Sequence, residues 1–447
     1  MPETAAFSYP FATLQQLAAD VLKHARDKGA TACEVDVSEG FGQSVGVRCD
    51  EVETIEFNRD KGIGVTIYAG QRKGYASTSD FSPQALRETV EAALAIARFT
   101  AEDDCAGLAD AALMASDCPD LDLYHPWALT VDDAIALARR CEQAAFDASP
   151  LVSNSEGASV STQEAQFVAA NSHGFIGGYP TSRHYVSCSV IAGEQDAMQR
   201  DDWYTTHRCA GQLDDAAAVG RTAAGRAVAR LGGRKVRTGV YPVLFEAPLA
   251  AGLLSSFVHA ASGGALYRKS SFLVDHLGRR IMPAFVDIVE RPHVRRGFGS
   301  APFDSDGVAT RDRDVVSGGV LAGYFLSAYT ARKLGLQTTA NAGGSHNLVI
   351  APGELDFAGL LARMGQGLLV TELLGHGINY VTGDYSRGAA GFWVENGQIA
   401  HPVEEVTIAG NLREMLAGIV AVGNDLLVRG SKQTGSILIE RMTVAGD

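Results

Sequence analysis

The first half of the chain repeats one pattern of elements, and this repeat limits its folds more than any other feature. In each unit, apolar residues with helical spacing precede alternating strand-like segments, and a second helical pattern follows them. The units span about residues 11–99 and 130–231, and residues 100–129 between them lack sustained periodicity. The repeat predicts an α+β N-terminal domain, residues 1–235, made of two similar units.

Local signals mark several boundaries in these units. Capping residues predict the helix starts, namely Thr13 with Gln16, Ser82 with Pro83, and Thr130 with Asp133. A strand with alternating apolar residues is expected over 44–50 and another from Ile63, so a turn is predicted at Asp60-Lys61-Gly62.

The second half has a different character. From Val236 onward glycine is frequent, and helical patterns appear only near 247–265, 356–366 and 411–420. Residues 236–447 are therefore predicted to form a mainly antiparallel β domain with a few helices.

Composition excludes several classes of protein. The net charge of −14 and the absence of basic clusters argue against a nucleic-acid partner. No run of 18 apolar residues suggests a membrane span, and the N-terminus does not resemble a signal peptide. Seven cysteines without a CxxC pair indicate reduced thiols. We therefore expect a cytoplasmic location.

The common catalytic motifs are missing or have a simpler explanation. None of the eleven histidines is followed by Glu, which excludes an HExxH zinc site. Ser44 in Gly42-Gln43-Ser44-Val45-Gly46 leads into a strand and not a helix, so a nucleophile elbow is disfavoured. Asp304-Ser305-Asp306-Gly307 lacks the Gly and Glu of a calcium loop and is interpreted as an Asx turn.

The densest polar segment runs from Thr371 to Gly388. Its glycines would let backbone approach a ligand closely, and its polar side chains offer donors and acceptors. The same residues could equally form a lattice of turns that satisfies its own backbone. Physical reasoning alone leaves both interpretations open.

Long motifs in this half carry a resemblance to a known family. Gly375–Gly391 followed by Phe392–Gly397, together with Ile408–Leu412, Val422–Asp425 and the N-terminal Asn58–Gly74, resembles the TldD/PmbA family in its PmbA (TldE) branch. The resemblance implies a cytoplasmic metallopeptidase of two homologous subunits that encloses flexible peptides in a chamber. It also implies roles in maturing peptide-antibiotic precursors and degrading antitoxins. The TldD-type subunit is implied to hold zinc through a helical HExxxH motif and a C-terminal Cys.

The chain departs from that ligand set at each position. The two His positions fall near Ser255 and Ala260, and the Glu position falls near Ser256, with His259 left alone. The Cys position falls near Thr434, and no cysteine follows Cys209. We therefore expect neither metal nor catalytic residues in this chain, and zinc in a TldD-type partner.

A role in a substrate chamber or a subunit contact is the resulting hypothesis for the polar residues. The candidates are Asn341, Ser345, His346, Glu372, His376, Asn379, Thr382, Asp384, Tyr385, Ser386 and Arg387. Peptide substrates and a TldD-type subunit are the expected partners, and the isolated chain could form a homodimer. A self-sufficient metallopeptidase with an unusual metal site, and a regulatory protein-binding factor, remain as alternatives.

Overall fold

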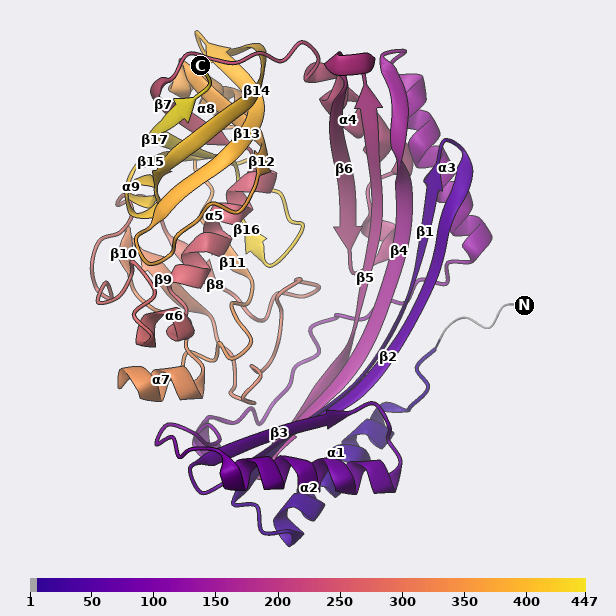
Figure 1. The fold of residues 1–447 in the computed structure, drawn as a ribbon, viewed down its shortest axis with the longest axis vertical. Coiled ribbons are helices and arrows are strands. Elements are labelled where there is room, and N and C mark those ends of the chain that lie inside the picture. The colour runs from indigo at the N-terminus through magenta and orange to yellow at the C-terminus, as the bar shows by residue number, and fades with distance from the viewer. Residues whose placement is uncertain (1–5) are drawn as a thin grey trace.

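One six-stranded antiparallel sheet dominates the N-terminal domain in the computed structural model, which describes residues 6–447 (Figure 1). Strands β1 and β4 pair from Val47–Ala158 to Glu34–Asn171, so the two sequence units share a single sheet. The strand order is β3-β2-β1-β4-β5-β6. The strands are β1 (Ala32–Arg48), β2 (Glu51–Ala69), β3 (Arg72–Thr78), β4 (Val152–Asn171), β5 (Ile176–Ala192) and β6 (Gln199–His207).

Two helix pairs cover the two ends of one face of this sheet. Helices α1 (Phe11–Asp27) and α2 (Pro83–Phe99) pack at one end, over Val35 and Val37. Helices α3 (Val131–Ala148) and α4 (Ala216–Ala229) pack at the other end, over Val45 and Val47. Alternation along β1 places all four valines on the same face, and the stretch of strand between the helix pairs separates two small cores.

The turn predicted at Asp60-Lys61-Gly62 is wrong. These residues lie inside β2, where they pair with residues 38–40 of β1. The chain instead turns at Cys49 and Asp50, which both have positive φ. Alternating burial begins at Ile63 because α1 and α2 cover the sheet from that point, while residues 51–61 are exposed.

The cap predicted for the first helix is also wrong. Helix α1 begins at Phe11, and its N-cap Pro10 offers no side-chain hydrogen bond. The Pro10 carbonyl accepts the Thr13 amide at 2.8 Å, and the Gln16 side chain donates to Asp20. The caps at Ser82 and Thr130 are confirmed, since each hydroxyl accepts the backbone amide three residues on.

The C-terminal domain contains two sheets. The first has the order β14-β13-β12-β7-β17-β15, and the second has the order β10-β9-β8-β11-β16. Most neighbours are antiparallel, but β7 with β12 and β11 with β16 are parallel. The strands are β7 (Gly239–Phe245), β8 (Ile288–Glu290), β9 (Arg313–Ser317), β10 (Val320–Leu321), β11 (Leu348–Ile350), β12 (Gly367–Leu374), β13 (Asp384–Glu395), β14 (Gln398–Asn411), β15 (Ile419–Val422), β16 (Lys432–Gln433) and β17 (Ile437–Ala445).

Helix α5 (Ala247–Ala260) lies in the core of this domain. Its Phe257 is buried in one cluster with Phe245 of the first sheet and with Ile288 of the second. The shorter helices are α6 (Gly263–Tyr267), α7 (Ala328–Leu334), α8 (Phe357–Met364) and α9 (Leu412–Ala417), of which α7 has no counterpart in the sequence prediction. Within the described residues, no helix is both long and apolar enough to cross a bilayer.

The C-terminal domain lies beside the face of the long sheet that carries no helices (Figure 1). An aromatic cluster joins the two, because the Phe303 ring packs edge-on against Phe167 and Tyr179 of the sheet. The α+β fold class is confirmed, and the molecule has a long curved wall facing a β-rich domain.

Candidate functional site

Helix α5 carries the four positions where the resemblance placed metal chemistry, and its side chains are engaged elsewhere. The Ser255 hydroxyl donates to the Ala251 carbonyl at 3.1 Å, and the Ser256 hydroxyl donates to Gly252 at 3.0 Å. Such bonds to the preceding turn satisfy each hydroxyl within the helix. Ala260 is fully buried, and His259 is exposed. One imidazole without further nitrogen, sulfur or carboxylate donors does not fit zinc.

The His259 ring packs at a tilt against the ring of Tyr380, a residue of the polar segment. Their ring centroids are 4.0 Å apart, with an interplanar angle of 35°. The Tyr380 carbonyl also accepts the Phe272 amide at 2.9 Å. The structure therefore brings the last turn of α5 together with the loop between β12 and β13.

That loop, residues 375–383, is held by its own polar groups. The Asn379 side chain accepts the Val381 amide at 3.0 Å, and the Thr382 hydroxyl donates to the Asp384 carboxylate at 2.6 Å. Asn411 donates to the second Asp384 oxygen at 3.2 Å. His376 and Ser386 are exposed on the same segment. The loop is a turn lattice whose outer side chains still face solvent.

The remaining candidates around this loop are partly or fully covered. Tyr385 is buried in the main core of the domain. The Arg387 guanidinium donates to the Leu373 carbonyl, and its buried Nε has no partner within the described residues. Glu372 forms an ion pair with Arg230, which directly follows α4. Glu372 therefore links the C-terminal domain to the long-sheet domain.

The second candidate segment, Asn341–Asn347, lies in a buried network. Asn341 donates to Glu290 at 2.9 Å, and Arg313 forms an ion pair with the same carboxylate at 2.6 Å. The His346 amide donates to Glu290 at 2.7 Å, and its ring Nε2 lies 2.9 Å from the Ala340 carbonyl oxygen. The Ser345 hydroxyl is buried without a partner among residues 6–447. These residues hold β8, β9 and their loops together.

The position assigned to the missing cysteine is also internal. Thr434 follows β16, is buried, and donates its hydroxyl to the Gly435 carbonyl at 2.9 Å. Nearby, Ser436 accepts the amide of Ala247, the first residue of α5, at 3.0 Å. The Ser436 hydroxyl donates to Asp425 at 2.6 Å. The C-terminal segment thus fixes the start of α5 through neutral or carboxylate groups and offers no thiolate.

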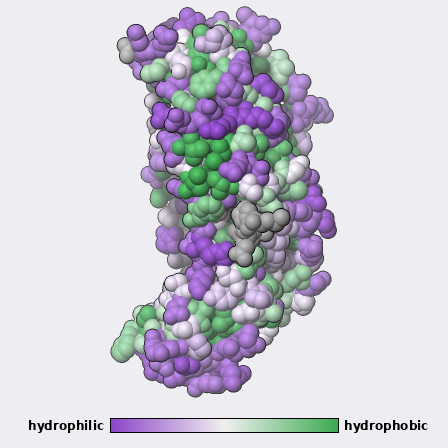
Figure 2. Space-filling view, turned by 90° about the vertical axis from the view of Figure 1, so that its right-hand side faces the viewer, coloured by the Kyte–Doolittle hydropathy of each residue, from purple (hydrophilic) through white to green (hydrophobic). Residues whose placement is uncertain are grey.

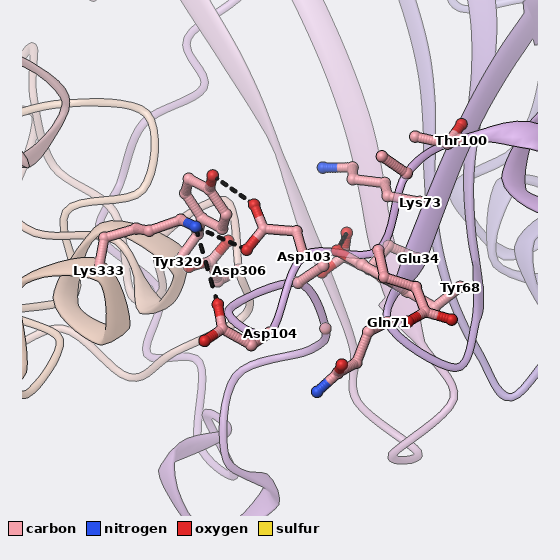
Figure 3. Close-up of a pocket in the computed structure, with 14 residues that line it drawn as sticks. Glu34, Tyr68, Gln71, Lys73, Thr100, Asp103, Asp104, Asp306, Tyr329 and Lys333 are labelled. Carbon is pink, nitrogen blue, oxygen red and sulfur yellow. Dashed lines mark hydrogen bonds and ion pairs between the residues drawn. The ribbon is translucent and has the colours of Figure 1, made fainter. Parts of the chain in front are cut away.

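A cavity of about 740 Å³ lies between the long sheet and the C-terminal domain (Figure 3). Glu34 and Lys73 come from the long sheet, Asp103 from the segment 100–129 between the two sequence units, and Asp306 and Lys333 from the C-terminal domain. The Lys333 ammonium lies 2.7 Å from an Asp103 oxygen. Tyr329 donates to the other Asp103 oxygen at 2.8 Å.

Burial and hydrogen bonding shift the pKa values of two carboxyl groups in this cavity, Glu34 and Asp103. The pKa of Glu34 is raised to about 7, first by loss of hydration and then by the nearby Asp306 carboxylate. The Tyr68 hydroxyl donates to Glu34 at 3.2 Å. Lys333, the Tyr329 hydroxyl and the Cys105 amide lower the pKa of Asp103 to about 2. Burial therefore favours the protonated form of the Glu34 carboxyl in this cavity.

Sequence reasoning did not find this cavity. Residues 100–129 lack periodicity in the sequence, yet Asp103 in this segment binds Lys333, which is 230 positions away. No periodicity or motif marks such a pair, because only the packing of the two domains brings it together. Acidic residues in the connector were the single available signal.

The chain is thus a two-domain α+β protein. Its inner helix α5 carries two serines, an alanine and one histidine that contacts Tyr380. Three domain models of the PmbA/TldA metallopeptidase family match the chain, as domain 1 at 33–97, the central domain at 124–231 and the C-terminal domain at 238–446. The chain belongs to this family.

Full-length relatives and solved structures agree with that assignment. Metalloprotease PmbA of Escherichia coli O157:H7 is 49% identical, and the alignment covers 97% of this chain and 96% of the relative. The Metalloprotease PmbA homolog of Haemophilus influenzae is 48% identical, with the same coverage. A Metalloprotease TldD homolog of that organism is 22% identical over 82% of this chain and 80% of its own.

Two solved structures have the same fold. One is from Bacteroides thetaiotaomicron and is described as a candidate modulator of DNA gyrase. It has a TM-score of 0.91 at 29% identity, covering 97% of this chain and 99% of its own. TldE from Thermococcus kodakarensis has a TM-score of 0.83 at 18% identity, covering 96% of this chain and all of its own.

Proposed function

We propose that this chain is the non-catalytic, TldE-type subunit of a two-subunit metallopeptidase that cuts flexible peptides. A TldD-type partner would supply the zinc and the catalytic residues. The observation that carries the proposal is the residue set of α5, where Ser255, Ser256 and Ala260 stand at the positions that the resemblance gives to the His, Glu and His of a zinc helix. The match to PmbA relatives over nearly the whole chain supports it.

The donor chemistry argues against zinc at α5. A zinc peptidase site needs three protein ligands and a group that activates water. Ser255 and Ser256 are satisfied by their own helix, and the His259 ring lies against Tyr380. The buried Thr434 supplies no thiolate. A partner subunit must then provide the metal.

The exposed residues of the β12–β13 loop are the proposed wall of the substrate chamber. His376, Asn379 and Thr382 are exposed in this loop, and Asp384 and Ser386 are exposed at the start of β13 directly after it. Exposed amide, hydroxyl, imidazole and carboxylate side chains of this kind can form hydrogen bonds to the backbone of an extended peptide without reading its sequence. The buried candidates Asn341, His346 and Tyr385 would maintain the shape of the domain.

A metal site in this chain alone would have to use residues outside α5. One group of possible ligands lies close together in the structure. Ligand atoms of Asp103, Asp104 and Cys105 lie within 4.8 Å of one another. The Lys333 ammonium, however, lies 2.7 Å from Asp103 and 3.9 Å from Asp104. A bound cation would have to displace this lysine, which disfavours metal binding there.

The experiment measures peptidase activity and bound zinc for the chain alone, the TldD-type partner alone, and the mixture. We expect activity only in the mixture, with zinc present in proportion to the partner. The variant His259→Ala should leave the zinc content of the mixture unchanged. Stoichiometric zinc and activity in the isolated chain would refute the proposal, and loss of that zinc in D103N would locate the site.

A further inference from the structure

The cavity between the long sheet and the C-terminal domain is lined by two kinds of charged group, and the first kind is already satisfied (Figure 3). The Asp103 carboxylate lies 2.7 Å from the Lys333 ammonium. The Glu102 carboxylate lies 3.3 Å from Arg72. Asp104 lies 3.9 Å from Lys333, and water can hydrate it because 84% of its side chain is exposed. Each of these acids therefore has a cation or solvent as its partner.

The second kind of charged group in the cavity has no such partner. Among residues 6–447, none forms an ion pair with Glu34, Asp306 or Lys73, and none forms a hydrogen bond with the Lys73 ammonium. One Glu34 oxygen accepts the Tyr68 hydroxyl at 3.2 Å, and one Asp306 oxygen accepts the Ala328 amide at 2.8 Å. The second oxygen of each carboxyl has no hydrogen-bond partner in the same range. Two carboxyl groups and one ammonium group can therefore contact a ligand.

These three groups stand on facing walls of the cavity. Val35 packs against the helices, so alternation along β1 places Glu34 on the helix-free face of the sheet. Lys73 of β3 pairs with Tyr68 of β2, whose hydroxyl reaches Glu34. Asp306 belongs to the C-terminal domain. The cavity thus lies on the inner side of the sheet, whereas Figure 2 shows the outer side, where apolar areas lie among hydrophilic ones. A ligand that contacts all three groups would join the two domains.

Burial leaves the two carboxyl groups short of positive charge. The pKa of Glu34 is raised to about 7, first by loss of hydration and then by Asp306, and loss of hydration also raises the pKa of Asp306. Lys73 lowers both pKa values without coming within ion-pair distance of either carboxyl. A further cation beside these groups would replace the lost hydration and favour their ionised forms. The cavity therefore favours a ligand whose cationic groups outnumber its carboxylates.

We propose that this cavity binds a free amino acid with a cationic side chain, such as lysine. The ligand carboxylate contacts Lys73, and its two ammonium groups contact Glu34 and Asp306. One carboxylate and two cations are the complement of the two carboxyls and one ammonium that lack partners. The rings of Tyr68 and Tyr329 line the same cavity and can pack against the methylene groups of the ligand. The cavity volume of about 740 Å³ lies within the range of about 300–1,000 Å³ that is usual for small-molecule sites.

Two close analogues of lysine use fewer of these groups. Cadaverine has both ammonium groups but no carboxylate, so it leaves Lys73 without a partner and adds like charge beside it. Norleucine has the carboxylate and one ammonium group, so it leaves one of the two buried carboxyls without a cation. Each analogue differs from lysine by one charged group and keeps a similar chain length. A comparison of the three ligands therefore isolates the contribution of each group.

Isothermal titration calorimetry of the purified chain with L-lysine, cadaverine and L-norleucine tests the proposal. We expect lysine to bind with one site per chain. Both analogues should bind about tenfold more weakly or worse, because each lacks one charge-assisted hydrogen bond. Failure of lysine to bind at millimolar concentration overturns the proposal, and so does equal affinity for either analogue.

Two substitutions locate the site within the chain. Lys73→Met removes the partner of the carboxylate, so it should weaken lysine binding by about tenfold without weakening cadaverine binding. Asp306→Asn keeps an acceptor for the Ala328 amide and should weaken the binding of both ligands. Lys23→Met is the matched control, because Lys23 is exposed on α1 outside this cavity. Equal lysine affinity of the Lys73 and Lys23 variants would refute the site. These measurements use the chain alone and do not depend on a TldD-type partner.

Discussion

Glu372 of β12 and Arg230 beside α4 form an ion pair that joins the two domains. Arg230 also lies 3.6 Å from Asp201 of β6, and only 11% of its side chain is exposed. Glu372→Gln leaves this guanidinium without one of its two carboxylate partners, in surroundings that hydrate it poorly. We expect a loss of about 1–3 kcal/mol in the free energy of unfolding, measured by urea denaturation.

Glu405 provides the matched control for that substitution. It pairs with Lys235 at 3.4 Å, and both side chains are about half exposed or more. Water hydrates both groups when such a pair is lost, so Glu405→Gln should change the stability by about 0.5 kcal/mol or less. Equal effects of the two substitutions would contradict the role assigned to Glu372.

Glu34 should make the stability of the protein depend on pH. Its folded pKa of about 7 lies above the ordinary glutamate pKa of 4.5, so the folded state binds the proton more tightly. The stabilising contribution of the protonated form is complete below about pH 4.5 and is lost as the pH rises to about 7. Glu34→Gln removes this loss and keeps an acceptor for the Tyr68 hydroxyl.

Urea denaturation at two pH values checks this prediction. Glu34→Gln and the wild type should have similar stability at pH 5, and the variant should be more stable by about 1–3 kcal/mol at pH 8. Glu102→Gln alters an exposed carboxylate on the same cavity and should show no such difference between the two pH values. A variant that is less stable than the wild type at pH 8 would mean that the charged form of Glu34 is favoured in the fold.

The long helices of the N-terminal domain were predictable because each has a buried stripe, as at Leu14, Ala18 and Val21 of α1, whereas the short α7 was missed. The first half of β2 was not, because residues 51–61 are exposed on both faces and no alternation marks them. The turn was predicted at 60–62 because alternating apolar residues begin at Ile63, although the strand continues through these residues. Burial patterns report what covers a strand, and the cover here comes from helices distant in sequence.

For the candidate site, too, some features could be predicted from the sequence and others depend on tertiary packing. The sequence was sufficient to predict α5, because its apolar residues have helical spacing, and the ligands that it is expected to lack follow from the family resemblance. The contact between the His259 and Tyr380 rings, and the ion pair between Glu372 and Arg230, depend on how loops and domains pack. No spacing rule relates the partners, so these contacts could only be found in the structure.

The β12–β13 loop gives a prediction for the proposed complex. Asp384→Ala removes the acceptor for Thr382 and Asn411 at the exposed end of β13. We expect reduced peptidase activity of the complex, by about tenfold, while pairing and the urea midpoint of the isolated chain change little. The readouts are the kcat/KM of the mixture and its mass in solution. Normal cleavage by a correctly assembled variant complex would exclude Asp384 from the chamber wall.

Two glycines of α4 test how closely the helices of the second unit pack. A Cβ atom at Gly220 would overlap the Cys141 carbonyl oxygen of α3, whereas a Cβ at Gly225 meets nothing within 4 Å. Alanine is favoured over glycine by about 1 kcal/mol in a helix, so Gly225→Ala should stabilise the protein by about 0.5–1 kcal/mol.

Gly220→Ala gains the same helix propensity but forces α3 and α4 apart. The core between them consists of small side chains, including Ala138, Ala223 and Ala224, which leave no room for a shift without opening a gap. The expected net effect is a loss of about 1–3 kcal/mol in the free energy of unfolding. Urea denaturation of both variants beside the wild type should therefore give shifts of opposite sign. If both substitutions stabilised the protein, the close contact between α3 and α4 would be absent in solution.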